Sequence, residues 1–140
     1  YAKLRYSNED VSISDDCAFG FAKVDVHRAA IDDCDEMAVL NVISGDIYIE
    51  TVLNNGSTSS TDTTDNWADD EIHKLKVLVA KDGAVTYKID GQAPSTTASF
   101  SFDQGEVVTP MMYVLQASDL AGSMILRKLI VKSDKGSLEE

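Results

Sequence analysis

Residues 74–90, KLKVLVAKDGAVTYKID, carry the clearest structural signal in the chain. Apolar and polar residues alternate along both arms of this stretch, and a period of two is typical of half-buried antiparallel strands. A three-residue loop at 81–83 places Val77 opposite Tyr87, so that the apolar residues of both arms share one face, whereas a two-residue loop would mix the faces. The stretch therefore predicts a hairpin in which Gly83 takes the left-handed conformation that ends such a turn.

A second hairpin is predicted over residues 38–53, AVLNVISGDIYIETVL. With Gly45 and Asp46 as a two-residue loop, Val42 opposes Ile49 and the remaining residues also pair in register. Both faces of this hairpin are largely apolar, so we expect it to lie centrally in a sheet.

The rest of the chain has the pattern of short strands separated by turns. The strand at 18–27 loses its alternation near Ala22, which indicates a bulge. Because no helices alternate with the strands, we expect an all-β antiparallel β-sandwich. The further strands are expected at 18–27, 107–116 and 123–132, with short edge pieces at 11–14 and 99–102. Loops are expected at the acidic segment 27–37 and at the polar, low-complexity segment 56–65.

Length and charge narrow the classes of function. The 140 residues are expected to form one domain at 1–132, with a polar tail at 133–140. Twelve basic against 24 acidic residues give a net charge of -12, which argues against nucleic acid and against an anionic membrane surface. The chain begins at Tyr1 without a signal-peptide pattern, and it contains no apolar run of about 20 residues that could span a bilayer.

Two cysteines, Cys17 and Cys34, are too few for a disulfide framework. We expect them in neighbouring strands, where they could pair. Two thiols are the preferred interpretation, because the core is large enough to be stable without a disulfide.

Several motifs together resemble the concanavalin-A-like jelly-roll family, which includes legume-type lectins, laminin-G-like domains and laminarinase-type glucanases. The motifs are a tryptophan at Trp67, the segment HKLKVLV at 73–79, VTYKIDG at 85–91 and FSFDQG at 100–105. The resemblance covers about residues 46–132 and implies a concanavalin-A-like jelly roll.

A narrower resemblance concerns GDIYIETVLNN at 45–55 and TDTTDNW at 61–67, which look like parts of modules in tailed-phage virion proteins. It implies a structural or decoration module located in the virion, with capsid or other virion proteins as partners. The chain is shorter than most jelly rolls of the family. An N-terminal strand or two could therefore be truncated, or a neighbouring subunit could supply them. Exposed edges would be covered by association, so a homo-oligomer is expected.

The family's enzymes carry the pattern Glu-x-Asp-x-x-Glu, which directs two carboxylates into one cleft. No glutamate of this chain is followed two residues later by aspartate: Glu50 precedes Thr51 and Val52. The only histidines, His27 and His73, do not lie in the context of a hydrolytic triad. The sequence therefore predicts that the protein is not an enzyme.

Clustered carboxylates raise the alternative of a calcium site, because calcium binds six to eight oxygens. Such loops often hold calcium in lectins and laminin-G-like domains of this fold. The preferred interpretation is an acidic, solvated turn without a metal, and no cofactor is expected. The candidate calcium ligands are Asp32, Asp33, Asp35 and Glu36.

A carbohydrate site is the second alternative, since an aromatic face beside Asn and Asp side chains is typical of sugar binding. It would make the protein a lectin-like carbohydrate-binding domain of a secreted or surface protein, with a host-surface glycan as partner. The competing interpretation, which we prefer, is that Trp67 lies under the edge of the sandwich. The candidate sugar-binding residues are Asn54, Asn55, Asp65, Asn66 and Trp67.

Overall fold

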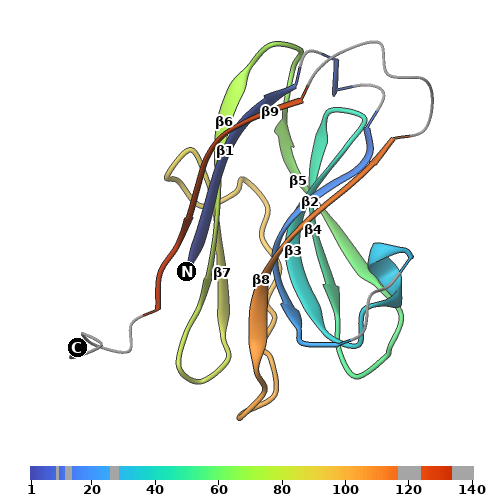
Figure 1. Ribbon diagram of the computed structural model, residues 1–140, viewed down its shortest axis with the longest axis vertical. Coiled ribbons are helices and arrows are strands. Elements are labelled where there is room, and N and C mark those ends of the chain that lie inside the picture. The colour runs from blue at the N-terminus through green and yellow to red at the C-terminus, as the bar shows by residue number, and fades with distance from the viewer. Residues whose placement is uncertain (9, 12–13, 26–28, 117–123, 134–140) are drawn as a thin grey trace.

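The computed structural model describes residues 1–8, 10–11, 14–25, 29–116 and 124–133, and it shows two antiparallel sheets packed face to face (Figure 1). One sheet has four strands in the order β7-β6-β1-β9, and the other has five in the order β5-β4-β3-β2-β8. The all-β sandwich predicted from the sequence is confirmed. The strands are β1 (Ala2–Asn8), β2 (Ser14–Lys23), β3 (Met37–Ile43), β4 (Asp46–Val52), β5 (Ser59–Asn66), β6 (Ile72–Val79), β7 (Val85–Ile89), β8 (Val108–Gln116) and β9 (Met124–Val131).

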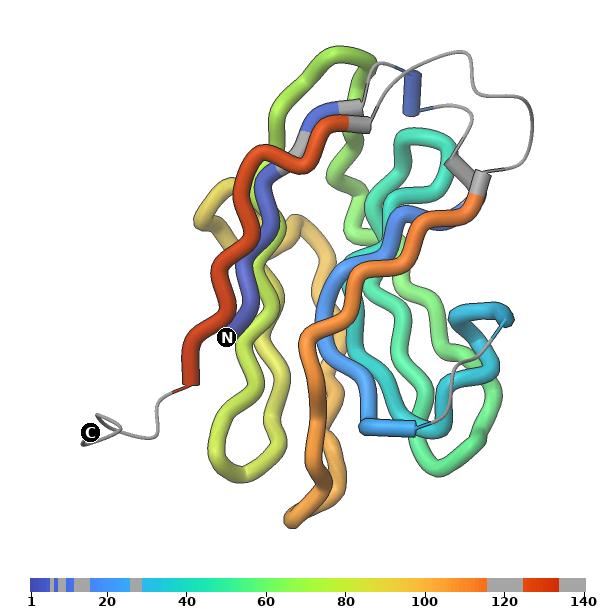
Figure 2. The backbone as a smooth tube through the Cα atoms, in the orientation of Figure 1, coloured from blue at the N-terminus to red at the C-terminus, as the bar shows by residue number. Residues whose placement is uncertain are grey.

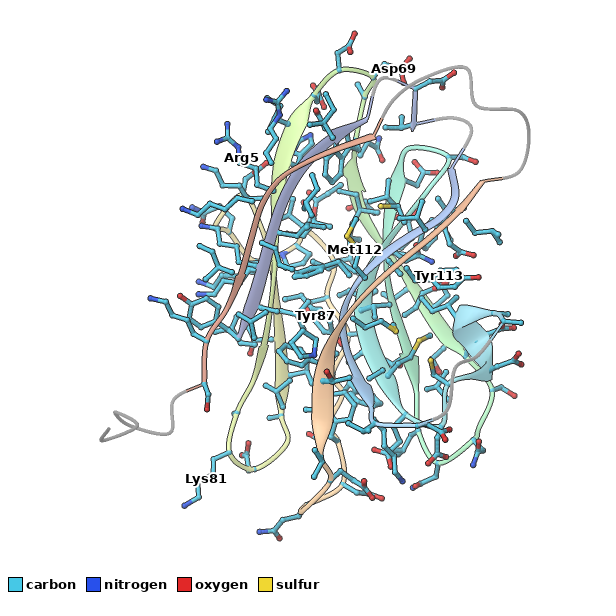
Figure 3. The ribbon with its side chains drawn as sticks, viewed as in Figure 1. Arg5, Asp69, Lys81, Tyr87, Met112 and Tyr113 are labelled. Carbon is cyan, nitrogen blue, oxygen red and sulfur yellow. The ribbon has the colours of Figure 1, made fainter. Side chains whose placement is uncertain are left out.

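The main hydrophobic core lies between the two sheets. Successive side chains of a strand point to opposite faces, so every second residue of the inner strands enters this core. Leu4 of β1, Phe19 of β2, Leu40 of β3 and Leu75 of β6 are all essentially inaccessible to solvent. Figure 3 shows Tyr87 of β7 in the same layer between the sheets.

A smaller apolar cluster covers part of the outer face of the five-stranded sheet. The segment that contains η2, a short 3₁₀ helix at Ile31–Asp33, lies over this face and buries Ile31 against it. The cluster consists of Ala18, Ala22, Ile31, Met37, Val39 and Val52, with Cys34, Met111 and Tyr113 packed against it.

Among the described residues, no helix is long and apolar enough to cross a membrane.

The β6–β7 hairpin has the register predicted from its alternation. Val77 pairs with Tyr87 and Leu75 with Ile89, and Gly83 has a φ of +88°. A Cβ atom at Gly83 would also collide with the carbonyl oxygen of Phe102. Glycine is therefore required there by both backbone conformation and space.

The predicted turn between β3 and β4 is wrong by one residue. Its two central residues are Ser44 and Gly45, with φ of +50° and +90°, as a two-residue hairpin loop with positive φ at both positions requires. Val42 therefore pairs with Ile47 rather than with Ile49. The pairing moves by two residues, so the faces are unchanged, and the predicted central position of the hairpin is confirmed.

Three further expectations about strands are corrected. The segment 56–65 is not wholly a loop, because β5 occupies Ser59–Asn66 at the sheet edge, where most of its side chains are exposed and Thr63 is buried. Residues 99–102 form no strand and make only an isolated bridge, between Ser101 and Ala84. The irregularity in β2 lies between Ser14 and Asp16 rather than near Ala22.

The N-terminal strand β1 was not predicted, although it lies between β6 and β9 in the four-stranded sheet. Of the predicted edge piece at 11–14, Val11 is outside any strand, and residues 12–13 lie outside the described part of the chain. The strand expected at 18–27 ends at Lys23, and residues 26–27 are likewise not described. The tail residues 134–140 also lie outside the described residues.

Cys17 lies in β2 and is buried, whereas Cys34 follows η2 and lies outside any strand, contrary to the expected neighbouring strands. Both are present as thiols.

Candidate functional site

The most unusual surface of the molecule is the side of the sandwich bounded by β8 and β9. Each of these strands is the last strand of its sheet, so each has one edge without a strand partner among the described residues. Figure 2 shows β8 (orange) and β9 (red) along the same side of the molecule, one at the edge of each sheet. An exposed strand edge offers unpaired main-chain N–H and C=O groups to another chain.

Inward-facing apolar side chains are accessible to solvent on this side. Leu129 of β9 pairs with the buried Leu4, and Met112 of β8 pairs with the buried Phe19, so both face the layer between the sheets. Yet Leu129 is 50% exposed and Met112 is 37% exposed. We define the open side as four half-exposed apolar residues that face this layer, Met112, Val114, Leu129 and Val131.

A cavity of about 780 Å³ lies at one end of the open side. Its lining comes from both sheets and includes core residues as well as the first residue of the chain. The main chain of Tyr1 is held there by two hydrogen bonds to Lys132, of 2.6 and 2.8 Å. The apolar lining includes Phe21, Val79, Phe102, Val108, Pro110 and Val131.

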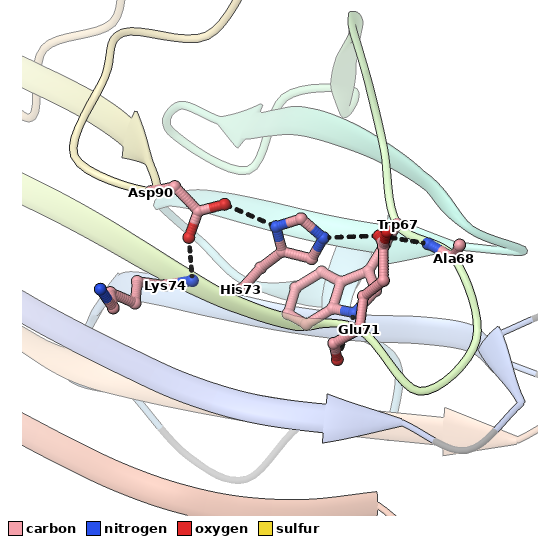
Figure 4. Close-up of polar contacts among 6 residues, drawn as sticks. All are labelled: Trp67, Ala68, Glu71, His73, Lys74 and Asp90. Atoms are coloured by element: carbon pink, nitrogen blue, oxygen red, sulfur yellow. Dashed lines mark hydrogen bonds and ion pairs between the residues drawn. The ribbon is translucent and has the colours of Figure 1, made fainter.

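Trp67 does not lie at the surface. It is 2% exposed, its indole N–H donates to the carbonyl oxygen of Glu71 at 3.3 Å, and its ring meets the ring of His73 edge to face at 4.6 Å (Figure 4). A sugar stacks on an exposed aromatic face, and Trp67 offers none. The side chain lies under the edge of the sandwich, which is the interpretation preferred from the sequence.

The other candidate sugar ligands do not gather around Trp67. Asn54 and Asn55 lie in the turn between β4 and β5, whereas Asn66 pairs with Asp46 at the opposite end of that strand pair. A strand of eight residues is about 25 Å long, so these two groups cannot share a sugar ring. Asp65 is already engaged by the backbone N–H and hydroxyl of Ser95, at 2.9 and 2.7 Å. The predicted sugar-binding residues therefore do not come together in one site.

His73 is held between two carboxylates, as Figure 4 shows. Its Nδ1 lies 2.6 Å from Asp90 and its Nε2 lies 2.9 Å from Glu71. Burial lowers the pKa of His73, but the hydrogen bonds to Glu71 and Asp90 outweigh it and raise the pKa above its ordinary value of 6.5. Because both nitrogens face carboxylates, neither is left to accept a proton from a nucleophile. The group connects the segment before β6 to the end of β7.

The predicted calcium ligands do not converge on one point. Asp32 and Asp33 are exposed on η2. Asp35 instead forms an ion pair with the ammonium of Lys23 at 2.8 Å, and Glu106 contacts the same ammonium at 3.2 Å. Lys23 therefore supplies the positive charge that these carboxylates need.

Glu36 is fully buried, and burial raises the pKa of its carboxyl group above the ordinary value. Its carboxylate lies 3.7 Å from the same ammonium of Lys23. Within the described ranges, no group of three or more His, Cys, Asp or Glu side chains is arranged to hold a metal ion.

The open side was not found from the sequence. The signal was present in β9, MILRKLIV, where apolar residues occupy both faces of a strand that also carries two basic residues. That pattern alone predicts a central strand, and only the topology shows that β9 ends its sheet.

Comparison with known proteins finds no family model that matches the chain and no curated protein that is significantly similar to it.

Proposed function

We propose that this protein is a non-enzymatic structural or decoration module of a tailed-phage virion, held in the particle by protein–protein contacts along its open side. The single observation that carries the proposal is the row of inward-facing, half-exposed apolar side chains on β8 and β9. The virion setting rests on the resemblance of residues 45–55 and 61–67 to modules of that class.

The partner is an extended apolar segment of another virion protein. Such a segment adds to the free edge of β8 or β9 through main-chain hydrogen bonds, and it places alternate side chains over the open side. Burying the exposed half of a Leu or Val side chain contributes roughly 1 kcal/mol. The four residues of the open side would then contribute on the order of 4 kcal/mol, before the cost of ordering the segment.

The added strand also fits the proposed family. A strand from a neighbour would pair with the edge of β8 or β9 that has no strand partner among the described residues, as in a concanavalin-A-like jelly roll with more strands in its sheets. Jelly-roll connectivity is therefore part of the proposal.

The geometry of the candidate sugar-binding residues disfavours a lectin-like function. Its aromatic residue, Trp67, is buried, and its asparagines lie at opposite ends of the β4–β5 pair.

The test uses particles of the phage that encodes the chain, with Leu129→Asp as the variant and Leu53→Asp as its control. Leu53 is similarly exposed, at 42%, but directly follows β4, away from β8 and β9. We expect purified particles to contain the wild-type and Leu53→Asp chains, and to lose Leu129→Asp by tenfold or more on immunoblots. A chain that is absent from wild-type particles, or a Leu129→Asp chain that is retained fully, would overturn the proposal.

A further inference from the structure

Basic residues are concentrated on the four-stranded sheet of this acidic protein. The sequence of its four strands contains seven of the twelve Lys and Arg residues of the chain and no Asp or Glu. The four-stranded sheet is therefore strongly positive although the chain has a net charge of -12. The seven residues are Lys3, Arg5, Lys74, Lys76, Lys88, Arg127 and Lys128.

Six of these seven form a cationic face, which we define as Lys3, Arg5, Lys74, Lys76, Lys88 and Lys128. Arg5 pairs across the sheet with both Lys74 and Lys128, and Lys76 pairs with both Lys3 and Lys88. Paired residues share a face, and the core residues next to them in sequence point inward, so all six point outward. Figure 3 shows Arg5 on this outer side, away from the core.

The charges of the cationic face are not paired within the described part of the chain. None of its six residues forms an ion pair with any residue that the structure describes. Like charges directly opposite one another on a sheet are destabilising, so the arrangement has a cost that an anionic partner would relieve. A cavity of about 190 Å³ between the cations is lined by Lys3, Arg5, Lys74, Lys128 and Ile130.

The opposite face of the sandwich carries a group of carboxylates. Asp46 and Glu50 lie on β4, and Asp62 pairs with Tyr48 between them. The amide nitrogen of Asn41 donates to Glu50 at 2.8 Å and to Asp16 of β2 at 2.6 Å. Burial, followed by the charges of Asp46, Asp62 and Glu50, raises the pKa of Tyr48. We define the acidic face as the exposed Asp46 and Asp62 together with the partly buried Asp16 and the buried Glu50 beneath them.

We propose that the cationic face of one copy docks on the acidic face of a second copy, so that the chains associate head to tail. The contact uses different surfaces on the two partners, so repeated docking gives a ring or a filament. This inference concerns the outer sheet faces and is independent of the open side and of the virion setting.

A second copy fits these observations better than a long polyanion. The acidic face is a β-sheet surface with the same strand spacing of about 4.8 Å as the cationic face, so rows of opposite charge can align. A nucleic acid or other extended polyanion would also meet the surplus of carboxylates elsewhere on the chain, 24 against twelve basic residues.

Screening allows the contact despite the net charge. At about 0.15 M salt the Debye length is about 8 Å, less than the roughly 10 Å between packed sheets, so each face acts mainly through its own charges. At about 0.01 M it is about 30 Å, and the net negative charges of two copies repel. At about 1 M it is about 3 Å, and the attraction itself is screened.

The contact is expected to be weak. Four strands of about seven residues present a face of about 450 Å², so the contact buries less than the roughly 1,200 Å² of a standard interface. Association should therefore appear at protein concentrations of hundreds of micromolar.

The test is sedimentation velocity of the purified chain with two double variants and their mixture. Arg5→Glu with Lys128→Glu reverses exposed residues of the cationic face, and Asp46→Lys with Asp62→Lys reverses exposed residues of the acidic face. Lys81→Glu is the control, because Lys81 lies at the exposed tip of the β6–β7 hairpin (Figure 3).

We expect the wild type and Lys81→Glu to associate, each double variant to be monomeric, and the mixture of the two double variants to associate again. Recovery in the mixture distinguishes loss of the contact from loss of folding. Wild-type association should be greatest near 0.15 M salt and at least tenfold weaker at 1 M.

A wild-type chain that stays monomeric at these concentrations, or a mixture that does not associate, would overturn the inference. So would a monomer that binds heparin through the cationic face, because another anion would then be its partner. Association that strengthens with salt and is lost in Leu129→Asp would point to contact through the open side, leaving the proposed function standing and this inference refuted.

Discussion

Nδ1 of His73 lies 2.6 Å from the Oδ2 atom of Asp90, the residue that follows β7. The other oxygen of Asp90 accepts the backbone N–H of Lys74 at 2.8 Å, so one carboxylate fixes the start of β6 to the end of β7 (Figure 4). Glu71 completes the group by accepting from the other ring nitrogen and from the N–H of Ala68. The group thereby fixes the loop at 68–71, in which the carbonyl oxygen of Glu71 accepts from the indole N–H of Trp67.

The stability of this group should depend on pH. The folded pKa of His73 is raised, so its contribution is fully present below the ordinary value of 6.5 and is lost as pH rises through the folded value. The hydrogen bond from His73 is the main cause that lowers the pKa of Glu71 in the folded protein. The stabilisation that Glu71 contributes is therefore present above pH 4.5 and is lost as pH falls through the folded pKa of Glu71.

We therefore expect the group to be most stabilising between about pH 4.5 and 6.5. Urea unfolding of the wild type and of His73→Gln across pH 4–9 measures it. The difference in unfolding free energy should shrink as pH rises above that window. A difference that is constant with pH would show that the carboxylates do not stabilise the imidazolium.

Gly83→Ala should destabilise the protein more than Gly105→Ala. Both glycines have positive φ, of +88° and +95°, which costs an alanine about 1 kcal/mol. Only at Gly83 would the new Cβ also meet a backbone atom, the carbonyl oxygen of Phe102, whereas nothing lies within 4 Å at Gly105. Thermal unfolding should give a loss of about 2–4 kcal/mol at Gly83, and equal losses at the two sites would argue against the close packing of the turn.

Trp67 should report a buried environment and not a sugar. As the only tryptophan, it gives the whole tryptophan emission of the chain. We expect native emission to be blue-shifted and poorly quenched by acrylamide, and to be unchanged by added mono- and oligosaccharides. Trp67→Ala should cost about 3–5 kcal/mol of stability because it leaves a large cavity. A saturable change in the emission on addition of a sugar would instead support the hypothesis of a carbohydrate site at Trp67.

Two leucines that face each other should differ greatly in their contribution to stability. Leu4 and Leu129 pair between β1 and β9, but Leu4 is fully buried and Leu129 is half exposed. Leu4→Ala should cost about 2–5 kcal/mol, and Leu129→Ala less than about 1.5 kcal/mol. Urea unfolding measures both. Similar large losses would mean that the open side is closed in the free chain.

Local alternation was enough to predict the β6–β7 register, because the apolar residues of both arms must share one face. It failed for the turn between β3 and β4. A two-residue loop at 44–45 and one at 45–46 place the same residues on each face of the hairpin, and only the positive φ of Ser44 distinguishes the two placements. β5 was missed because a polar edge strand has no apolar alternation. The predicted sugar residues were close in sequence, but β5 runs back along β4 and carries Asn66 away from Asn54.

The open side could not be predicted, because a strand pattern shows which residues face a core but not which strand ends a sheet. Leu129 of β9 and Leu75 of β6 both occupy core-facing positions in strands of similar pattern, yet Leu129 is half exposed and Leu75 is fully buried. The difference comes from the strand order, in which β6 has neighbours on both sides and β9 on one among the described residues.

Amide hydrogen exchange of the chain, free and within purified phage particles, tests the central claim most directly. A partner strand on the open side would pair main-chain groups that water reaches in the free chain. We predict slower exchange in the particle across β8 or β9, with the β6–β7 turn at 81–83 unchanged. Equal exchange of β8 and β9 in the two samples, or protection confined to other strands, would contradict the proposal that the protein is held by its open side.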